Sequence, residues 1–171
     1  MKAALRRHPR LVAPLLAAGS LGAIGLLGIW AGIPWLFPSL GPTVALQASS
    51  PELPVSRPWN VAGGHLVGLA CGLLVVHVTG AASVPGVTEA HALSGVRVGA
   101  AVLAVLLSMW VQTALRARHP PAEATTLLIA LGALAPDLDT TLAVLGGVLL
   151  VTALGESMRR LLGGDGKQPE T

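Results

Sequence analysis

The hydrophobic residues of this chain form four long runs and two short ones, separated by polar or proline-rich stretches. The long runs cover about residues 11–36, 61–82, 93–115 and 140–162. As helices, they are long enough to cross the roughly 30 Å hydrocarbon core of a membrane. The short runs, about residues 42–49 and 122–134, are too short to cross it as helices alone. The order is long, short, long, and it occurs twice.

A proline-containing stretch leads into each short run. The two stretches read Phe37-Pro38-Ser39-Leu40-Gly41-Pro42-Thr43 and Arg118-His119-Pro120-Pro121-Ala122-Glu123-Ala124-Thr125-Thr126. Proline suits the first turn of a helix, where its missing N–H would have no partner anyway. We therefore expect two short Pro-headed half-helices. Each is approached through extended backbone, which a membrane tolerates only inside protein or beside a water-filled cavity.

Positive charge along the chain predicts its orientation. Lys and Arg gather at residues 2–10, 57, 116–118 and 159–167. The positive-inside rule places all four groups in the cytoplasm, together with both termini. This requires six crossings and gives a 3+3 inverted-topology repeat, with repeat one at about residues 11–82 and repeat two at about 93–162. The alternative, four spans plus two re-entrant loops, places residues 116–118 outside.

The composition indicates a membrane protein. The chain is 53% hydrophobic and only 11% charged, whereas soluble domains carry about 25% charged residues. We predict an all-α polytopic helical bundle in the inner cell membrane, in contact with lipid. Residues 1–162 form one transmembrane domain, and residues 163–171 form a polar, disordered cytoplasmic tail. The basic N-terminus resembles a signal peptide, but the apolar run after it is too long, so an uncleaved helix is expected.

Several classes of function find no support in the residues. The net charge of +3 comes from Lys and Arg that flank apolar runs, so no nucleic-acid partner is predicted. The single cysteine, Cys71, lies inside an apolar run and excludes an intrachain disulfide or a Cys-based metal site. Neither a zinc-protease motif nor a phosphate-binding loop is present. We predict no metal, no cofactor and no catalytic residues, and therefore no enzyme.

The two short helices are predicted to begin near mid-membrane, one from each side, so that their N-termini face a shared region. A helix N-terminus presents unpaired N–H groups and about half a positive charge, which together attract anions. No Lys or Arg lies in either first turn, so an anion binds loosely enough to leave again. The candidate anion-binding residues are Ser39, Gly41, Pro42, Thr43, His119, Pro120, Pro121, Thr125 and Thr126.

One carboxylate, Glu123, lies in the first turn of the second short helix. The helix dipole stabilises its charge by about 0.3–1 kcal/mol, or up to ~2 kcal/mol if partly buried. A charge at the bilayer centre costs about 2.5–3.5 kcal/mol. Glu123 is therefore expected near the aqueous boundary, paired, or protonated. It either titrates during transport and couples a proton, or it is a structural carboxylate that pairs with Arg116, Arg118 or His119.

Two histidines are further candidates. His65, one turn into the third run, is predicted to take part in proton coupling with Glu123, with a packed core residue as the alternative. His119 is a candidate for substrate binding or proton transfer, since histidine titrates near neutral pH. Its alternative is a structural cap beside two arginines.

The two proline-containing stretches resemble the HPP family of small integral membrane proteins. Residues 119–125 are similar to the family's His-Pro-Pro-Ala-Gly-Ala-Thr, and residues 38–46, with Ser50-Pro51, Arg57-Pro58, Asn60 and Gly63-Gly64-His65, resemble its other block. Glu123 stands where the family usually has Gly, and Gly41-Pro42-Thr43 stand where it has Gly-Ala-Ser. Some members are linked to nitrite transport in plastids or cyanobacteria, which implies a small-anion permease by analogy.

We therefore predict a transporter or channel for a small inorganic anion such as nitrite. A non-transporting membrane sensor or assembly module is the first alternative. An intramembrane enzyme is the second, and it requires His65, His119 and Glu123 around one substrate. Glycines at three-residue spacing in the first long run, and at four-residue spacing in the next, predict close helix packing and a homo-oligomer.

Overall fold

The computed structural model describes residues 9–162, and within that range every regular element is a helix. Four long helices are α2 (Pro9–Ala31), α4 (Pro58–Val78), α6 (Gly95–Ala114) and α8 (Leu138–Leu162). All four are apolar and long enough to span a membrane. The short helices are α3 (Leu40–Ser49), α7 (Ala122–Ala130), α5 (Val87–Ala90), η1 (Pro54–Ser56) and η2 (Ala81–Ser83). The predicted disordered tail and the basic residues 2–8 lie outside the described residues.

Helices α2 and α7 are among those that end earlier than predicted, and a glycine follows the end of each. We expected the first long run to stay helical to about residue 36, but α2 ends at Ala31. Gly32 has a φ of 69°, a left-handed conformation that glycine adopts without strain. The second short helix, predicted to reach about residue 134, ends at Ala130, and Gly132 has a φ of 70°.

Two other helices begin earlier than predicted. Helix α4 starts at Pro58, whose ring suits the first helical position, rather than at about residue 61. Helix α8 starts at Leu138 rather than at about residue 140. The backbone N–H of Thr140 donates to the Asp137 side chain at 2.7 Å, so this carboxylate caps α8. Hydrogen bonds from Thr140 hold the pKa of Asp137 below its usual range.

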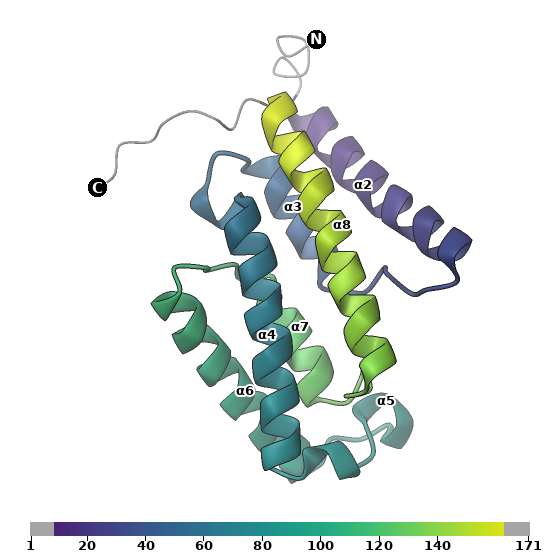
Figure 1. The fold of residues 1–171 in the computed structure, drawn as a ribbon, viewed down its shortest axis with the longest axis vertical. Coiled ribbons are helices and arrows are strands. Elements are labelled where there is room, and N and C mark those ends of the chain that lie inside the picture. The colour runs from purple at the N-terminus through teal and green to yellow at the C-terminus, as the bar shows by residue number, and fades with distance from the viewer. Residues whose placement is uncertain (1–8, 163–171) are drawn as a thin grey trace.

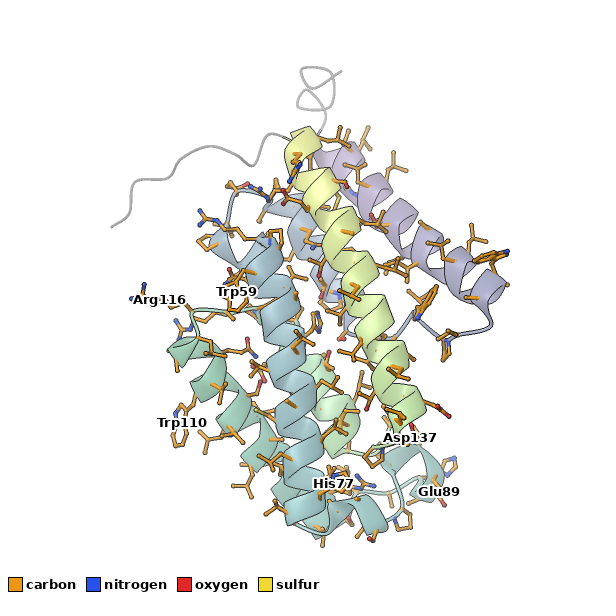
Figure 2. The ribbon with its side chains drawn as sticks, in the orientation of Figure 1. Trp59, His77, Glu89, Trp110, Arg116 and Asp137 are labelled. Carbon is orange, nitrogen blue, oxygen red and sulfur yellow. The ribbon has the colours of Figure 1, made fainter. Side chains whose placement is uncertain are left out.

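Consecutive main helices run in opposite directions. In Figure 1, α2 descends from the end near the N-terminus, α3 rises, and α4 descends to the far end of the molecule. In the second half α6 rises, α7 descends and α8 rises. Figure 2 shows His77, Glu89 and Asp137 toward the lower end, away from Trp59 and Arg116. The turn containing α5, which the sequence did not predict, lies at that lower end.

Each short helix packs against a long helix from the other half of the chain. Helix α7 lies along Gly64, Gly68 and Gly72 of α4; a Cβ atom at Gly68 would be 2.8 Å from the Ala122 carbonyl oxygen. Helix α3 lies along α8, where Gly155 faces Gln47. Helix pairs approach this closely only where the residues between them are small.

The glycines bear on the expected homo-oligomer. The glycine face of α4 is covered by α7 of the same chain, so it is not available to a second copy. On α2, a Cβ atom at Gly19 or Gly22 would meet nothing within 4 Å. That part of the first glycine stripe contacts no other helix of the described chain, and the homo-oligomer stays a prediction.

Candidate functional site

Five polar side chains meet where the starts of α3 and α7 come together beside α4. We call them the central cluster, and they are Ser39, Thr43, His65, His119 and Thr125. All five residues have 0% of their surface exposed. His65 lies seven residues into α4, about 10 Å from its start. Burying polar groups is costly unless each finds a hydrogen-bond partner.

His65 bridges the two short helices. Its Nε2 atom lies 2.9 Å from the Thr43 hydroxyl of α3, and its Nδ1 atom lies 2.8 Å from the Thr125 hydroxyl of α7. The Thr125 hydroxyl is also 2.8 Å from Ser39 Oγ, the side chain that precedes α3. The two short helices are thus joined both directly and through one imidazole.

His119 extends the cluster away from the two short helices. Its Nε2 atom lies 3.2 Å from the Thr43 hydroxyl, and its Nδ1 atom lies 2.8 Å from the backbone oxygen of Val55. The rings of His65 and His119 are 5.1 Å apart, centre to centre. Thr43 therefore stands between the two histidines.

The first-turn N–H groups of both short helices already have partners, which the sequence did not predict. Those of Leu40 and Gly41 donate to the carbonyls of Phe37 and Pro38, at 3.0 and 3.3 Å. The N–H groups of residues 122–124 likewise donate to the carbonyls of His119, Pro120 and Pro121. Tight turns at helix starts satisfy these donors locally. Hydroxyl and imidazole groups, rather than backbone N–H groups, therefore fill the region between the helices.

The remaining predicted binding residues lie around the central cluster rather than in it. Pro42 and Pro120 are exposed, while Gly41 and Pro121 are half-buried. Thr126 is fully buried, but its hydroxyl lies 3.4 Å from Ser108 Oγ of α6. The structure thus separates neighbouring threonines of α7 into two environments.

A second group of polar residues lies between α6 and α7. We call it the Glu123 cluster, and it contains Ser108, Gln112, Glu123 and Thr126. Glu123 Oε1 accepts hydrogen bonds from Gln112 Nε2 at 2.7 Å and from Ser108 Oγ at 3.2 Å. Glu123 Oε2 is buried without a hydrogen-bond partner in the described part of the chain.

The structural alternative for Glu123 named the wrong partners. The described residues show no ion pair or hydrogen bond between its carboxylate and Arg116, Arg118 or His119. Amide and hydroxyl groups of α6 hold it instead. Arg118 Nε donates to the Thr113 hydroxyl at 3.2 Å.

Gln112 joins the two clusters. Its Oε1 atom accepts from the backbone N–H of His119 at 3.0 Å, while its Nε2 atom donates to Glu123. Sequence reasoning missed both Ser108 and Gln112. The signal that could have found them is their four-residue spacing inside an apolar span, which puts both side chains on one face of a helix.

Two hollows lie beside the backbone that leads into the short helices. The α8 hollow, about 590 Å³, is lined by the stretch before α3 and the first turns of α8, including Phe37, Pro38 and Asp139. The α6 hollow, about 350 Å³, is lined by the stretch before α7 and the end of α6, including Arg118, His119 and Glu123. His119 of the central cluster lines the α6 hollow, and Pro38, the residue before Ser39, lines the α8 hollow. No group of three metal-binding side chains occurs among the residues described.

Four spanning helices around a buried polar centre define a polytopic helical membrane protein. The chain matches the family model for the transmembrane region of HPP over residues 3–165. It therefore belongs to the HPP family, as its two motif blocks predicted. Comparisons with curated proteins and with solved structures found no match.

Proposed function

We propose that this protein is a membrane permease, a transporter or channel, for a small inorganic anion such as nitrite. The observation that carries the proposal is the fully buried central cluster, with one hollow lined by its His119 and another by Pro38, next to its Ser39. Polar and ionisable side chains inside a membrane are costly, and where they occur they usually mark a substrate or ion pathway. The passage runs between the starts of α3 and α7.

The chemistry of the central cluster suits a weakly bound oxyanion. Its hydroxyl and imidazole groups donate hydrogen bonds, and none of its members is Lys or Arg. Sites for transported ions must bind strongly enough to admit the ion and weakly enough to release it. The cluster is closed, so it has to open for an anion to pass. The hydrogen bond between Ser39 and Thr125 is the contact that breaks.

We also propose that the two halves form the inverted repeat. Support comes from the opposite directions of α2–α3–α4 and α6–α7–α8 (Figure 1). In the two motif blocks, Thr43 and Thr125 hold corresponding positions, and His65 bonds to both. Each short helix also has a hollow beside the backbone leading into it. Transporters of this construction carry their substrate where two broken helices meet.

The proposed orientation places both termini in the cytoplasm of the inner membrane. Glu89 and Asp137 lie at the end away from Arg116 (Figure 2). Short cytoplasmic loops are those rich in Lys and Arg. The α6 hollow, which Arg118 lines, then lies on the cytoplasmic side.

Proton coupling through Glu123 is part of the proposal. Its unpartnered Oε2 atom is free to take a proton, and the residue lines the α6 hollow. A group that titrates during transport changes the pH dependence of flux when it is replaced. His65 is the second member of this coupling, since it joins both short helices.

Nitrite flux into proteoliposomes of the full-length protein tests the proposal. Thr125→Val removes a central-cluster hydroxyl, and Thr152→Val removes a part-buried hydroxyl that bonds within α8, outside both clusters. Protein-free vesicles measure the leak of nitrous acid. We expect protein-dependent flux that is lost in Thr125→Val and retained in Thr152→Val. Absence of flux above the leak for nitrite, nitrate, formate and chloride rejects the permease and favours the sensor or assembly module.

A further inference from the structure

The hydrogen bonds of the central cluster form one continuous chain, and a single carbonyl fixes its direction. The Val55 oxygen can only accept, so His119 Nδ1 carries a proton and donates to it at 2.8 Å. In a neutral imidazole the other nitrogen then accepts. The Thr43 hydroxyl, 3.2 Å from His119 Nε2, can donate to it, and its other acceptor is the Ser39 backbone oxygen at 2.9 Å.

The remaining directions follow in turn, because each hydroxyl has one proton. The Thr43 proton goes either to His119 or to the Ser39 carbonyl, so with either acceptor the Thr43 oxygen accepts from His65 Nε2 at 2.9 Å. Since His65 Nε2 carries the proton of its neutral ring, His65 Nδ1 accepts from Thr125 at 2.8 Å. Thr125 in turn accepts from Ser39 at 2.8 Å.

We propose that the chain Ser39–Thr125–His65–Thr43–His119 is a directed relay that carries one proton at a time between the α8 hollow and the α6 hollow. The proposal deepens the permease function and rests on it for the link to anion movement. The relay itself can be measured without a permeant anion.

The transfer conserves protons at every step. A proton arriving at Ser39 Oγ displaces the hydroxyl proton to Thr125, whose own proton moves to His65 Nδ1. His65 releases its Nε2 proton to Thr43, and Thr43 releases its proton to His119 Nε2. One proton has entered at Ser39, and His119 has become an imidazolium that donates from both nitrogens. It returns to the neutral form by releasing its Nδ1 proton to the α6 hollow, which it lines, as its bond to the Val55 oxygen breaks. All hydrogen bonds between side chains now point the opposite way, so the chain must reset before a second proton passes.

Thr43 offers a second setting that suits the charged form of His119. Its hydroxyl also lies 2.9 Å from the backbone oxygen of Ser39. When His119 donates from Nε2, the Thr43 proton turns to that carbonyl, and Thr43 Oγ1 accepts from His119 instead. A single hydroxyl rotation therefore accommodates either charge state of His119.

Both ends of the relay lie next to a hollow that holds titratable groups. At the Ser39 end, the neighbouring Pro38 lines the α8 hollow together with Asp139. At the other end, His119 lines the α6 hollow with Arg118 and Glu123. A proton therefore enters or leaves the relay by way of these hollows.

The test follows internal pH in proteoliposomes that contain the full-length protein and a trapped pH-sensitive dye. One arm applies a nitrite gradient. The other applies a potassium gradient with valinomycin and gluconate as the anion. Thr43→Val and His65→Gln break the relay, while Thr43→Ser keeps its hydroxyl. Thr152→Val and His77→Gln are matched controls, since the Thr152 hydroxyl bonds to the Val148 backbone oxygen within α8 and His77 is exposed at the far end of α4.

We expect protein-dependent proton movement in at least one arm. Thr43→Val and His65→Gln reduce it to the rate of protein-free vesicles, and Thr43→Ser and both controls retain it. Proton movement that survives both relay variants overturns the proposal, as does its absence from the wild type in both arms. Nitrite flux without any pH change rejects the relay and leaves the permease standing. Proton movement without nitrite flux supports the relay and rejects the nitrite permease.

Nitrogen-15 NMR of labelled histidine checks the direction independently. The relay predicts that neutral His65 carries its proton on Nε2 and neutral His119 on Nδ1. The spectra of His65→Gln and His119→Gln assign these two histidines among the five of the chain. A neutral His65 with its proton on Nδ1 contradicts the stated direction.

Discussion

The central cluster and the Glu123 cluster lie on two sides of one short helix, and they differ in how they are satisfied. Thr125 belongs to the first and Thr126 to the second. The central cluster draws on both halves of the chain, shows no exposed surface and pairs each imidazole nitrogen. The Glu123 cluster lies within the second half and leaves one carboxylate oxygen unpaired.

In the proposed permease the two clusters serve different purposes. The central cluster joins both halves, so its bonds would have to break for the passage to open. The Glu123 cluster lies within one half, so it could move as a unit and keep its unpaired carboxylate oxygen beside the α6 hollow. Gln112 bonds to both, so a change of charge at Glu123 reaches His119 through one amide.

Gly68→Ala is expected to disturb both clusters at once and to have the largest effect. Its methyl group would lie 2.7 Å from the Thr126 hydroxyl and 2.8 Å from the Ala122 carbonyl oxygen, so α7 has to shift. Overpacking of this kind costs about 1–3 kcal/mol. Thermal unfolding in detergent measures the loss. Gly99→Ala is the control, because its methyl group meets nothing within 4 Å. Equal stability of the two variants contradicts close packing of α4 and α7.

Gln112→Leu removes the hydrogen bonds that connect the two clusters and should cause the next largest loss of stability. The backbone N–H of buried His119 then loses its acceptor, and Glu123 loses its shortest hydrogen bond. An unpaired buried polar group costs about 1–3 kcal/mol. The same unfolding assay compares it with Ser157→Ala, an exposed position on α8. A stability loss no larger than that of Ser157→Ala shows that the link does not hold the clusters together.

Glu123→Gln tests the second cluster with a smaller change. The amide oxygen can still accept from Gln112 and Ser108, so stability should fall less than in Gln112→Leu. The variant cannot titrate, and we expect the pH dependence of nitrite uptake to flatten while uptake itself persists. Uptake measured across a pH series, beside the wild type, gives the answer. An unchanged pH dependence rejects the coupling role of Glu123.

Asp137→Ala lies outside both clusters and should have the smallest effect. It removes the cap from α8, so the unfolding temperature at neutral pH should fall slightly. The pKa of Asp137 is lowered because its ionised form accepts from Thr140, so this stabilisation is present above the ordinary aspartate pKa. It is lost as the pH falls through the folded-state pKa. Unfolding temperatures of wild type and variant should therefore converge in acid, and a constant difference contradicts the cap.

Local rules predicted much of the helical frame, because prolines, charges and apolar runs act within a few residues. Pro120 and Pro121 marked the start of α7, and the long apolar runs located the four spanning helices. The end of α2 was misplaced because Ile33 and Leu36 continue the apolar run past Gly32, where the backbone turns.

The site was only partly predictable. The sequence singled out Thr43, His65 and Thr125, but not that one imidazole joins both hydroxyls. That contact spans 22 residues on one side and 60 on the other, and it depends on how closely α7 approaches α4. The engagement of the first-turn N–H groups by proline-stretch carbonyls depends on turn geometry that a helix-start pattern does not specify.

The pairing of α3 with a long helix from the other half also has a consequence during biosynthesis: α3 gains that partner only after the second half has been made. Helices leave the ribosome and enter the membrane one after another, and α8 comes last. Until it arrives, α3 has no neighbour for Gln47, whose Nε2 atom bonds to the Val151 carbonyl at 3.4 Å. The first half therefore waits in lipid, with a polar amide uncovered, for the final segment of the chain. A stop codon before α8 leaves α3 packed on α2 but without the α8 surface that covers Gln47, and the quality-control proteases of the membrane should recognise the truncated chain as unfinished.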